Sequence, residues 1–240
     1  SKAIPNRHHG TVRRVEGREK EGYTVTWDGA TSGSLHCDAV VLATSAAEAV
    51  RLAPSLVVAA ERDFLGAVRE RPSVTLTAEL ERAPSGMPER VRLPHGEGFS
   101  AQSVVFEPGL AGTRVAPGEG LVSIRGSEAF ALGAAQMPDD AVEKSLLADF
   151  KILYPAMLGN IGQARLRRRE AGIPAFDVGA YRGLERLRRV QQDRRTLGRR
   201  LYLAGDYLVS PSIEGSVVSG FRAAADLLAD AAAGSATAGV

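Results

Sequence analysis

The sequence predicts a mixed fold, α/β plus α+β, in which an α/β domain with a parallel sheet is interrupted by an α+β domain. Two short apolar runs, at residues 38–44 and 201–204, indicate buried strands, and helix signals follow each of them. Between them, residues 55–172 include half-buried strands, in which apolar and polar side chains alternate. With 240 residues and 44% hydrophobic content, the chain is long enough for one large domain or two small ones with a real core.

The charge and cysteine content exclude several classes of protein. The 30 Lys and Arg residues against 28 Asp and Glu leave a formal charge of +2, too little for a global field that attracts nucleic acid or an anionic membrane. The single cysteine, Cys37, excludes an intrachain disulfide and a cysteine metal cluster, and it permits a reducing compartment. No apolar run approaches the roughly 18 residues of a membrane span. His8 and His9 would point to opposite sides of a strand, so we predict no metal site.

The first 54 residues predict a β-meander, a buried strand and a short helix. The unbroken apolar centre of residues 38–44 is typical of a strand covered on both faces, as in a parallel sheet. Ser45 and Glu48 then form a capping box for a helix that Pro54 ends. The strands of the meander, separated by turn-rich segments, are expected at residues 11–15, 23–27 and 34–37.

Residues 55–172 predict a separate α+β domain. Apolar and polar side chains alternate through residues 74–80, which predicts a half-buried strand. A helix with one apolar face is expected to begin near Asp140 and to end at Pro155. Further strands are expected at residues 101–106 and 121–125.

Two glycine-rich stretches in this domain imitate a phosphate-binding loop. The residues from Gly96 to Ala101 fit GxGxxA, and a similar string begins at Gly118. A dinucleotide fingerprint must follow a strand and open a helix. Gly96 instead follows a Leu-Pro-His sequence and precedes a β-like run, so we predict hairpin loops.

Residues 165–200 contain twelve arginines against four acidic residues, which raises the alternative of a basic, nucleic-acid-binding module. Leu184, Leu187 and Val190 lie on one side of a helix, so most of these arginines would decorate its outer face. Aromatic residues for base stacking are few in this segment. We therefore predict an amphipathic helix and no nucleic-acid partner.

The stretch from Leu201 to Ala229 predicts a strand, a turn at Gly205–Asp206 and a long helix. Ser210 would cap the helix, with Pro211 in its first position. From spacing alone, ordinary core packing and a ligand site are equally supported, because the Asp206 carboxylate can accept hydrogen bonds from hydroxyls and a helix N-terminus favours an anion. The apolar face of the helix would consist of Val217, Phe221, Ala224 and Leu228.

Two segments resemble a known family. The sequence AGDY followed by PSIEGSVVSGFRAA resembles the C-terminal FAD-binding motif of the flavin-dependent amine oxidase superfamily, which also contains the protoporphyrinogen oxidases and the carotenoid and squalene desaturases. Residues 11–44 resemble the same superfamily again, in the segment V-x-x-I … V … aDxVVxAtP. The sequence departs from these patterns in having Ser45 in place of a proline and Ser216 in place of an alanine.

The resemblance implies a site for FAD. Gly205 and Asp206 would lie beside the ribityl-phosphate part of the cofactor, and the backbone of Val12 would meet the adenine ring. We expect FAD to be bound non-covalently, and we expect no metal. The residues that would run along the isoalloxazine ring are Ile213, Glu214, Gly215, Ser216 and Val217.

The implied fold is a partial FAD-binding domain, Rossmann-like and of the GR2 type, with an inserted α+β substrate domain. The FAD-binding pieces would be residues 1–54 and 173–240, and the substrate domain residues 55–172, with an apolar sheet face as the roof over the flavin. The family begins with a strand–GxGxxG–helix unit, and none precedes Thr11. We therefore expect that the missing N-terminal half is supplied in cis or by a partner chain, or that the site is lost, and that this chain exposes a large apolar face.

The implied function is a FAD-dependent oxidoreductase that removes hydride from a small hydrophobic substrate, as desaturases and protoporphyrinogen oxidases do. Amine oxidases of this group place a lysine near flavin N5 and an aromatic pair around the site. Residues 73–80 contain no lysine, and Ser212 stands where an aromatic residue is expected. An amine oxidase and a non-catalytic FAD-fold subunit stay open as alternatives, and no acid, base or nucleophile is assigned. A cytoplasmic location is expected, with peripheral membrane contact left open.

Overall fold

The computed structural model describes residues 7–18, 21–30, 32–107 and 118–237. The chain divides into two compact units, which we call the first unit (Ser1–Arg69 with Pro174–Val240) and the second unit (Glu70–Ile173). The sequence placed the first boundary after residue 54. Helix α2 (Ala59–Ala67) belongs to the first unit, so the structure divides the chain between Arg69 and Glu70 instead.

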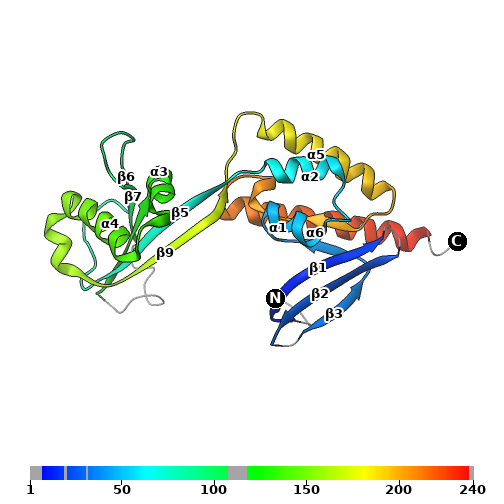
Figure 1. Ribbon diagram of the computed structural model, residues 1–240, viewed down its shortest axis with the longest axis horizontal. Helices are drawn as coiled ribbons and strands as arrows, with labels where there is room; N and C mark the ends of the chain where they lie inside the picture. Colours follow the sequence, from blue (N-terminus) through cyan, green and yellow to red (C-terminus); the bar gives the residue numbers. More distant parts are fainter. Residues whose placement is uncertain (1–6, 19–20, 31, 108–117, 238–240) are drawn as a thin grey trace. The chain divides into compact units, whose positions relative to one another are not determined.

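The first unit begins with the predicted β-meander (Figure 1). Its three antiparallel strands have the order β1-β2-β3 and run longer than the sequence indicated. Val15 and Tyr23 are directed into the core, and the Tyr23 hydroxyl accepts a hydrogen bond from the Arg200 backbone amide at 3.0 Å. The strand bounds are β1 (Gly10–Arg18), β2 (Gly22–Gly29) and β3 (Gly33–Cys37).

Two parallel strands form the centre of the first unit, and they are the two apolar runs of the sequence. β4 (Val40–Leu42) pairs with β10 (Leu201–Leu203), and among the described residues this sheet has no third strand. Helices surround this pair and share a core with the meander, because Val15, Leu42 and Leu203 belong to one buried cluster. Besides α2, these helices are α1 (Ala46–Leu52), α5 (Ala180–Thr196) and α6 (Ile213–Thr237).

The start of α1 confirms half of the predicted capping box. The Ser45 hydroxyl accepts a hydrogen bond from the Glu48 amide at 3.4 Å. The Glu48 carboxylate does not accept the reciprocal hydrogen bond from the Ser45 amide, because it pairs with Arg51 one turn later at 2.7 Å. The complementary half is found at α2, where the Glu61 carboxylate accepts a hydrogen bond from the Val58 amide at 3.1 Å, while Val58 has no side-chain acceptor to complete a box.

Several arginines of the 165–200 segment stabilise the first unit from inside. Arg199 is buried and pairs with the fully buried Glu61 of α2 at 2.5 Å. Arg195, on α5, forms two hydrogen bonds with Asp230 of α6, at 2.8 and 3.0 Å. Tyr202 of β10 donates to the same carboxylate at 2.8 Å. These contacts tie α2, α5, α6 and β10 together.

The second unit is a five-stranded sheet with helices on one face (Figure 1). The strand order is β6-β7-β8-β5-β9. As predicted, the apolar side chains of residues 74–80 are buried, and they pack with Val142, Leu146 and Phe150 of α4. The strands are β5 (Glu70–Leu80), β6 (Arg90–Arg92), β7 (Ala101–Glu107), β8 (Gly120–Gly126) and β9 (Ile161–Pro174). The helices are α3 (Glu128–Gly133) and α4 (Asp139–Leu153), with the 3₁₀ turns η1 (Ala134–Gln136) and η2 (Pro155–Asn160).

Strand β9 was not predicted, and it corrects the assignment of the arginine-rich segment. Only α5 is the expected amphipathic helix, with Leu184 and Leu187 buried. The earlier arginines of the segment lie on β9. Arg168 obscured the alternation of that strand because it points toward the helices, where it donates to the Ala134 carbonyl at 2.8 Å and pairs with Asp139 at 2.6 Å.

The structure shows that the glycine-rich stretch at Gly96 is a loop between two strands. This residue and Gly98 have positive φ values of 95° and 81°, and they form the loop that leads from β6 into β7. A strand follows, so the stretch lacks the helix that a dinucleotide loop requires.

Within the described ranges, no group of His, Cys, Asp or Glu could hold a metal ion. None of the described helices is both long and apolar enough to cross a membrane.

Candidate cofactor site

The turn after β10 is fastened to helix α6. The Gly205 amide donates a hydrogen bond to the Ser219 hydroxyl at 2.8 Å, and Ser219 is buried on the second turn of α6. Gly205 has an extended backbone, and a Cβ at this position would overlap the ring of Tyr207. Glycine is therefore needed here because the Tyr207 ring, buried in the core, crosses directly over the turn.

Asp206 opens the short 3₁₀ turn η3 (Asp206–Leu208). Its Oδ1 atom accepts a hydrogen bond from the Tyr207 amide at 3.0 Å. Partial burial raises the pKa of this carboxyl, while hydrogen bonds from the backbone amides of Tyr207 and of Asp206 itself act in the opposite direction. The side chain thus has a turn role, and as a partly desolvated acceptor it is also suited to bind hydroxyl groups.

Helix α6 is capped by Ser212 rather than by Ser210. The Ser212 hydroxyl accepts from the Gly215 amide at 3.0 Å, and its carbonyl accepts from the Ser216 amide at 3.1 Å. The Ser212 amide donates a hydrogen bond to the Ser210 carbonyl at 2.7 Å, and because of this tight turn the helix begins only at Ile213. Ser210 and Pro211 therefore precede the helix, and the predicted cap was displaced by two residues.

Gly215 is also required by the chain itself. A Cβ at this buried position would overlap the backbone oxygen of Ser210. The neighbouring members of the predicted set, Ile213, Glu214, Ser216 and Val217, are exposed. The fold of the chain is thus a sufficient reason for the glycine, and the exposed residues beside it stay available for the isoalloxazine ring.

The apolar face of α6 is exposed in this chain. Ile213 is 85% exposed, Phe221 72% and Leu228 67%, and together with Val217 they form a stripe along one side of the helix. The sequence had assigned Val217, Phe221 and Leu228 to an apolar face. The buried side of α6 instead contains small residues such as Ser219 and Ala223.

Val12, the expected adenine contact, lies on β1, which is an edge strand of the meander. It is half-buried and packs against the same core cluster as β4 and β10. The pairing of β1 with β2 shifts register between Val12 and Arg14. An edge strand leaves alternate backbone groups without a strand partner, which is what a backbone contact to an adenine ring requires.

A cavity of about 240 Å³ lies next to the Gly205–Asp206 turn in the first unit. Tyr207 forms one wall, and Phe64 and Leu184 contribute apolar surface. The segment from Pro174 to Ala180 supplies most of the remaining lining. The ring of Phe176 packs against Tyr181 with 5.6 Å between the centroids.

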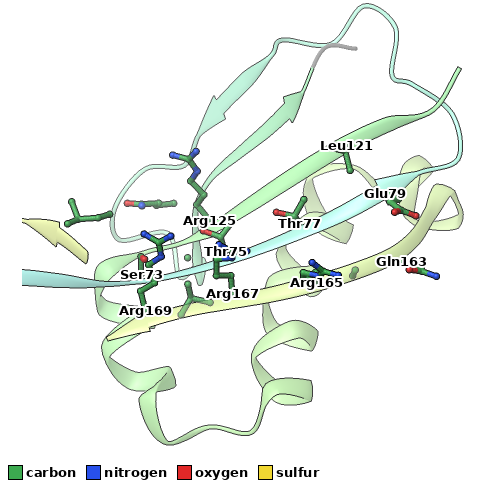
Figure 2. Close-up of a pocket in the computed structure, with 15 residues that line it drawn as sticks. Ser73, Thr75, Thr77, Glu79, Leu121, Arg125, Gln163, Arg165, Arg167 and Arg169 are labelled. Carbon is green, nitrogen blue, oxygen red and sulfur yellow. The ribbon is translucent and has the colours of Figure 1, made fainter. Parts of the chain in front are cut away.

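The second unit contains a larger cavity, of about 770 Å³, that the sequence did not reveal (Figure 2). It lies on the sheet face away from α3 and α4 and is lined by β5, β7, β8 and β9. The resemblance implied an apolar roof at this sheet. The helices cover one apolar face of this sheet, and charged and hydroxyl side chains line the other face together with Leu121 and Ile173. Its charged lining residues are Glu79, Arg125, Arg165, Arg167 and Arg169.

These features together define part of a FAD-type nucleotide-binding fold: a meander, a parallel pair, a Gly-Asp turn tied to a long helix, and an inserted second unit. The family model of the flavin containing amine oxidoreductases matches residues 7–228. The chain belongs to this family, and membership implies a flavin cofactor. The residues at the turn and on α6 fit such a group, because Asp206 offers a partly desolvated acceptor and the first turns of α6 offer an open apolar side.

Solved structures share this fold at low sequence identity. A protein from Exiguobacterium sp. 255-15 assigned as a protoporphyrinogen oxidase is 17% identical, with a TM-score of 0.64 over 92% of this chain. A putrescine oxidase variant is 18% identical, with a TM-score of 0.68 over 92% of this chain. Cyclohexylamine oxidase from Brevibacterium oxydans IH-35A is 17% identical, with a TM-score of 0.62 over 90%. The chain spans 45%, 48% and 47% of those chains, respectively. No curated protein sequence is significantly similar to this one.

Proposed function

We propose that this chain is the C-terminal part of a FAD-dependent oxidoreductase that takes hydride from a non-amine organic substrate. The observation that carries the proposal is the Gly205–Asp206 turn. Its fastening to α6 through Ser219 holds an acceptor carboxylate close to a helix whose first turns are open to a ligand. Family membership over residues 7–228 supports the same assignment.

The residues of the first unit would bind and orient the cofactor. Asp206 would accept hydrogen bonds from ribityl hydroxyls, and the N-terminal end of α6 would favour negative charge at the N1–C2=O edge of the ring. When bound, FAD supplies the hydride acceptor of the reaction. Burial raises the pKa of Cys37, and its thiol donates to the Tyr23 carbonyl at 3.6 Å, which supports non-covalent rather than thioether-linked FAD.

The N-terminal half would cover the open surfaces of the first unit. The β4–β10 pair has two strands among the described residues, and a strand–GxGxxG–helix unit would extend it. The later part of the exposed stripe of α6, at Phe221 and Leu228, offers apolar surface for packing. We propose that this half is supplied in cis or as a partner chain. A FAD-fold subunit without catalysis is the alternative if no such half joins it.

The substrate proposal separates this chain from amine oxidases. β5 has no lysine, and four arginines line the cavity of the second unit against one glutamate. A cationic amine would be repelled by this surface. Similarity to putrescine oxidase and cyclohexylamine oxidase is a similarity of fold, so it does not outweigh the charge of the cavity.

The flavin content of the complete protein tests the proposal. We expect the purified complete protein to show flavin absorbance, and acid precipitation should release all of the flavin into the supernatant. Identification of the released flavin as FAD by chromatography would support the assignment. A complete protein that neither retains nor binds added FAD would refute it, and flavin that stays with the precipitate would refute non-covalent attachment.

A further inference from the structure

The open face of the second unit's sheet forms a trough between long cationic side chains (Figure 2). Thr75 and Thr77 of β5 contribute short hydroxyl side chains to its floor, and Arg125 of β8 stands opposite Thr75 in the strand register. Neighbouring strands lie about 4.8 Å apart, so the two walls are separated by about 10 Å. β9, on the other side of β5, contributes Arg165, Arg167 and Arg169.

The guanidinium groups of this trough have no ion-pair partner among the described residues. In the described part of the chain, none of the four arginines forms an ion pair or a hydrogen bond, whereas Arg168, on the opposite face of β9, is paired with Asp139. Glu79 is the one carboxylate among the lining residues, and it lies with Gln163 at the end away from Arg125 (Figure 2). Like charges on one face repel each other, so this cluster of arginines destabilises the unit unless an anion balances it.

The lining of the trough indicates which anion it would bind. Every lining residue belongs to a strand, so neither a helix N-terminus nor a glycine-rich loop is present to hold a phosphate. No aromatic side chain lines the cavity for base stacking. Guanidinium groups bind planar carboxylates in a two-point geometry. Leu121 and Ile173 add apolar surface for the body of a ligand.

The spacing of the arginines sets the spacing of the charges on the ligand. Side chains two residues apart on a strand are about 7 Å apart, and those four residues apart are about 13 Å apart. Arg165, Arg167 and Arg169 therefore offer binding points at these separations along one wall. The volume of about 770 Å³ lies in the range of small-molecule sites.

We propose that this trough binds a small organic anion with two or more carboxylates, about 7 to 13 Å apart, on an apolar body. As a statement about the substrate, the proposal rests on the proposed function, in which the second unit is the substrate domain. As a binding site, it depends only on the arginines. It also refines the expectation of a hydrophobic substrate, since the body of the ligand is apolar and its ends are charged.

Calorimetric titration of the complete protein tests the site. The probes are dodecanedioate, the monocarboxylate dodecanoate, the diamine of the same length, and pyrophosphate. We expect dodecanedioate to bind more tightly than the other three, and its affinity to fall with added salt. Arg167→Gln and Arg169→Gln should each weaken its binding about tenfold, because each removes a charge-assisted contact. Arg90→Gln is the matched control, since Arg90 is exposed on β6 of the same sheet but does not line the cavity.

The outcomes separate this site from the proposed function. Equal loss in Arg90→Gln and Arg167→Gln, or tighter binding of the diamine, would overturn the site. Tighter binding of pyrophosphate would overturn the carboxylate assignment. All variants should retain the flavin content of the parent protein. Arginine-dependent binding of dodecanedioate by a protein that contains no FAD would support the site and refute the proposed function.

Discussion

Replacement of Asp206 by Asn and by Ala separates the turn role of this residue from its cofactor role. Asn retains an oxygen that can accept from the Tyr207 amide, so Asp206→Asn should keep the stability of the apoprotein. Asp206→Ala loses that hydrogen bond and should cost about 1 kcal/mol of unfolding free energy. Only the cofactor role predicts a larger effect on FAD than on folding.

The effect on FAD follows from the charge of the acceptor. Hydrogen bonds to charged groups contribute about 1.5–3 kcal/mol, which corresponds to roughly 10- to 100-fold in affinity. Asp206→Ala should weaken FAD binding by this factor. Asp206→Asn should have an affinity between those of the parent protein and the Ala variant. Fluorescence titration of the reconstituted complete protein measures the affinity, and urea unfolding of the apoproteins measures stability. Wild-type affinity in both variants would reduce Asp206 to a turn residue.

The raised pKa of Asp206 adds a pH dependence to this prediction. The carboxyl of the apoprotein is protonated at a higher pH than an ordinary aspartate, because partial burial disfavours its charge. FAD affinity should therefore rise with pH until the carboxyl is ionised and then level off. The Asn variant should show no such rise. An identical pH profile in the two proteins would refute a role for the charge.

Two further predictions concern the ion pairs of the first unit. Glu61→Ala should lower the free energy of unfolding, measured with urea, by about 3–5 kcal/mol because it leaves Arg199 buried and unpaired. The double variant Glu61→Leu, Arg199→Met should recover most of that stability. A loss below about 1 kcal/mol for Glu61→Ala would refute the burial of the pair. The hydrogen bond from Arg195 lowers the pKa of Asp230 below its ordinary value of 3.8. The carboxylate therefore stabilises the folded state above pH 3.8, and this contribution is lost as the pH falls through the lower pKa of the folded state. Acid unfolding of Asp230→Asn should lack this contribution, and unchanged acid sensitivity would contradict it.

The parts of the fold that the sequence predicted are those with a clean period. In α4, Val142, Leu146 and Phe150 recur at helical spacing, and in β5 each apolar residue is separated from the next by one polar residue. The family motif likewise located the Gly205–Asp206 turn correctly between β10 and α6. Its ligand role stays a prediction, because the geometry of the turn suits a hydroxyl ligand but does not require one.

The parts that the sequence missed depend on contacts that residue spacing does not show. The cap of α6 moved to Ser212 because the Ser210 carbonyl folds back on the chain, and no local pattern distinguishes one serine from the other. α2 contains Glu61 on its buried side, and a buried carboxylate is only tolerable because Arg199 reaches it from a distant segment. The trough of the second unit requires β8 and β9 to flank β5, and strand order is not written in residue spacing.

The alternating arginines of β9 also determine how this strand aligns with its neighbour. Ala164 and Leu166 pack against the core, while Arg165 and Arg167 carry guanidinium groups on the other face of the strand. A slip of one residue would exchange the two faces. It would drive several unpaired charges into the apolar layer beneath α4, a cost far above the stability of a small domain. The charges that make the open face suitable for an anion therefore also exclude the misaligned sheet.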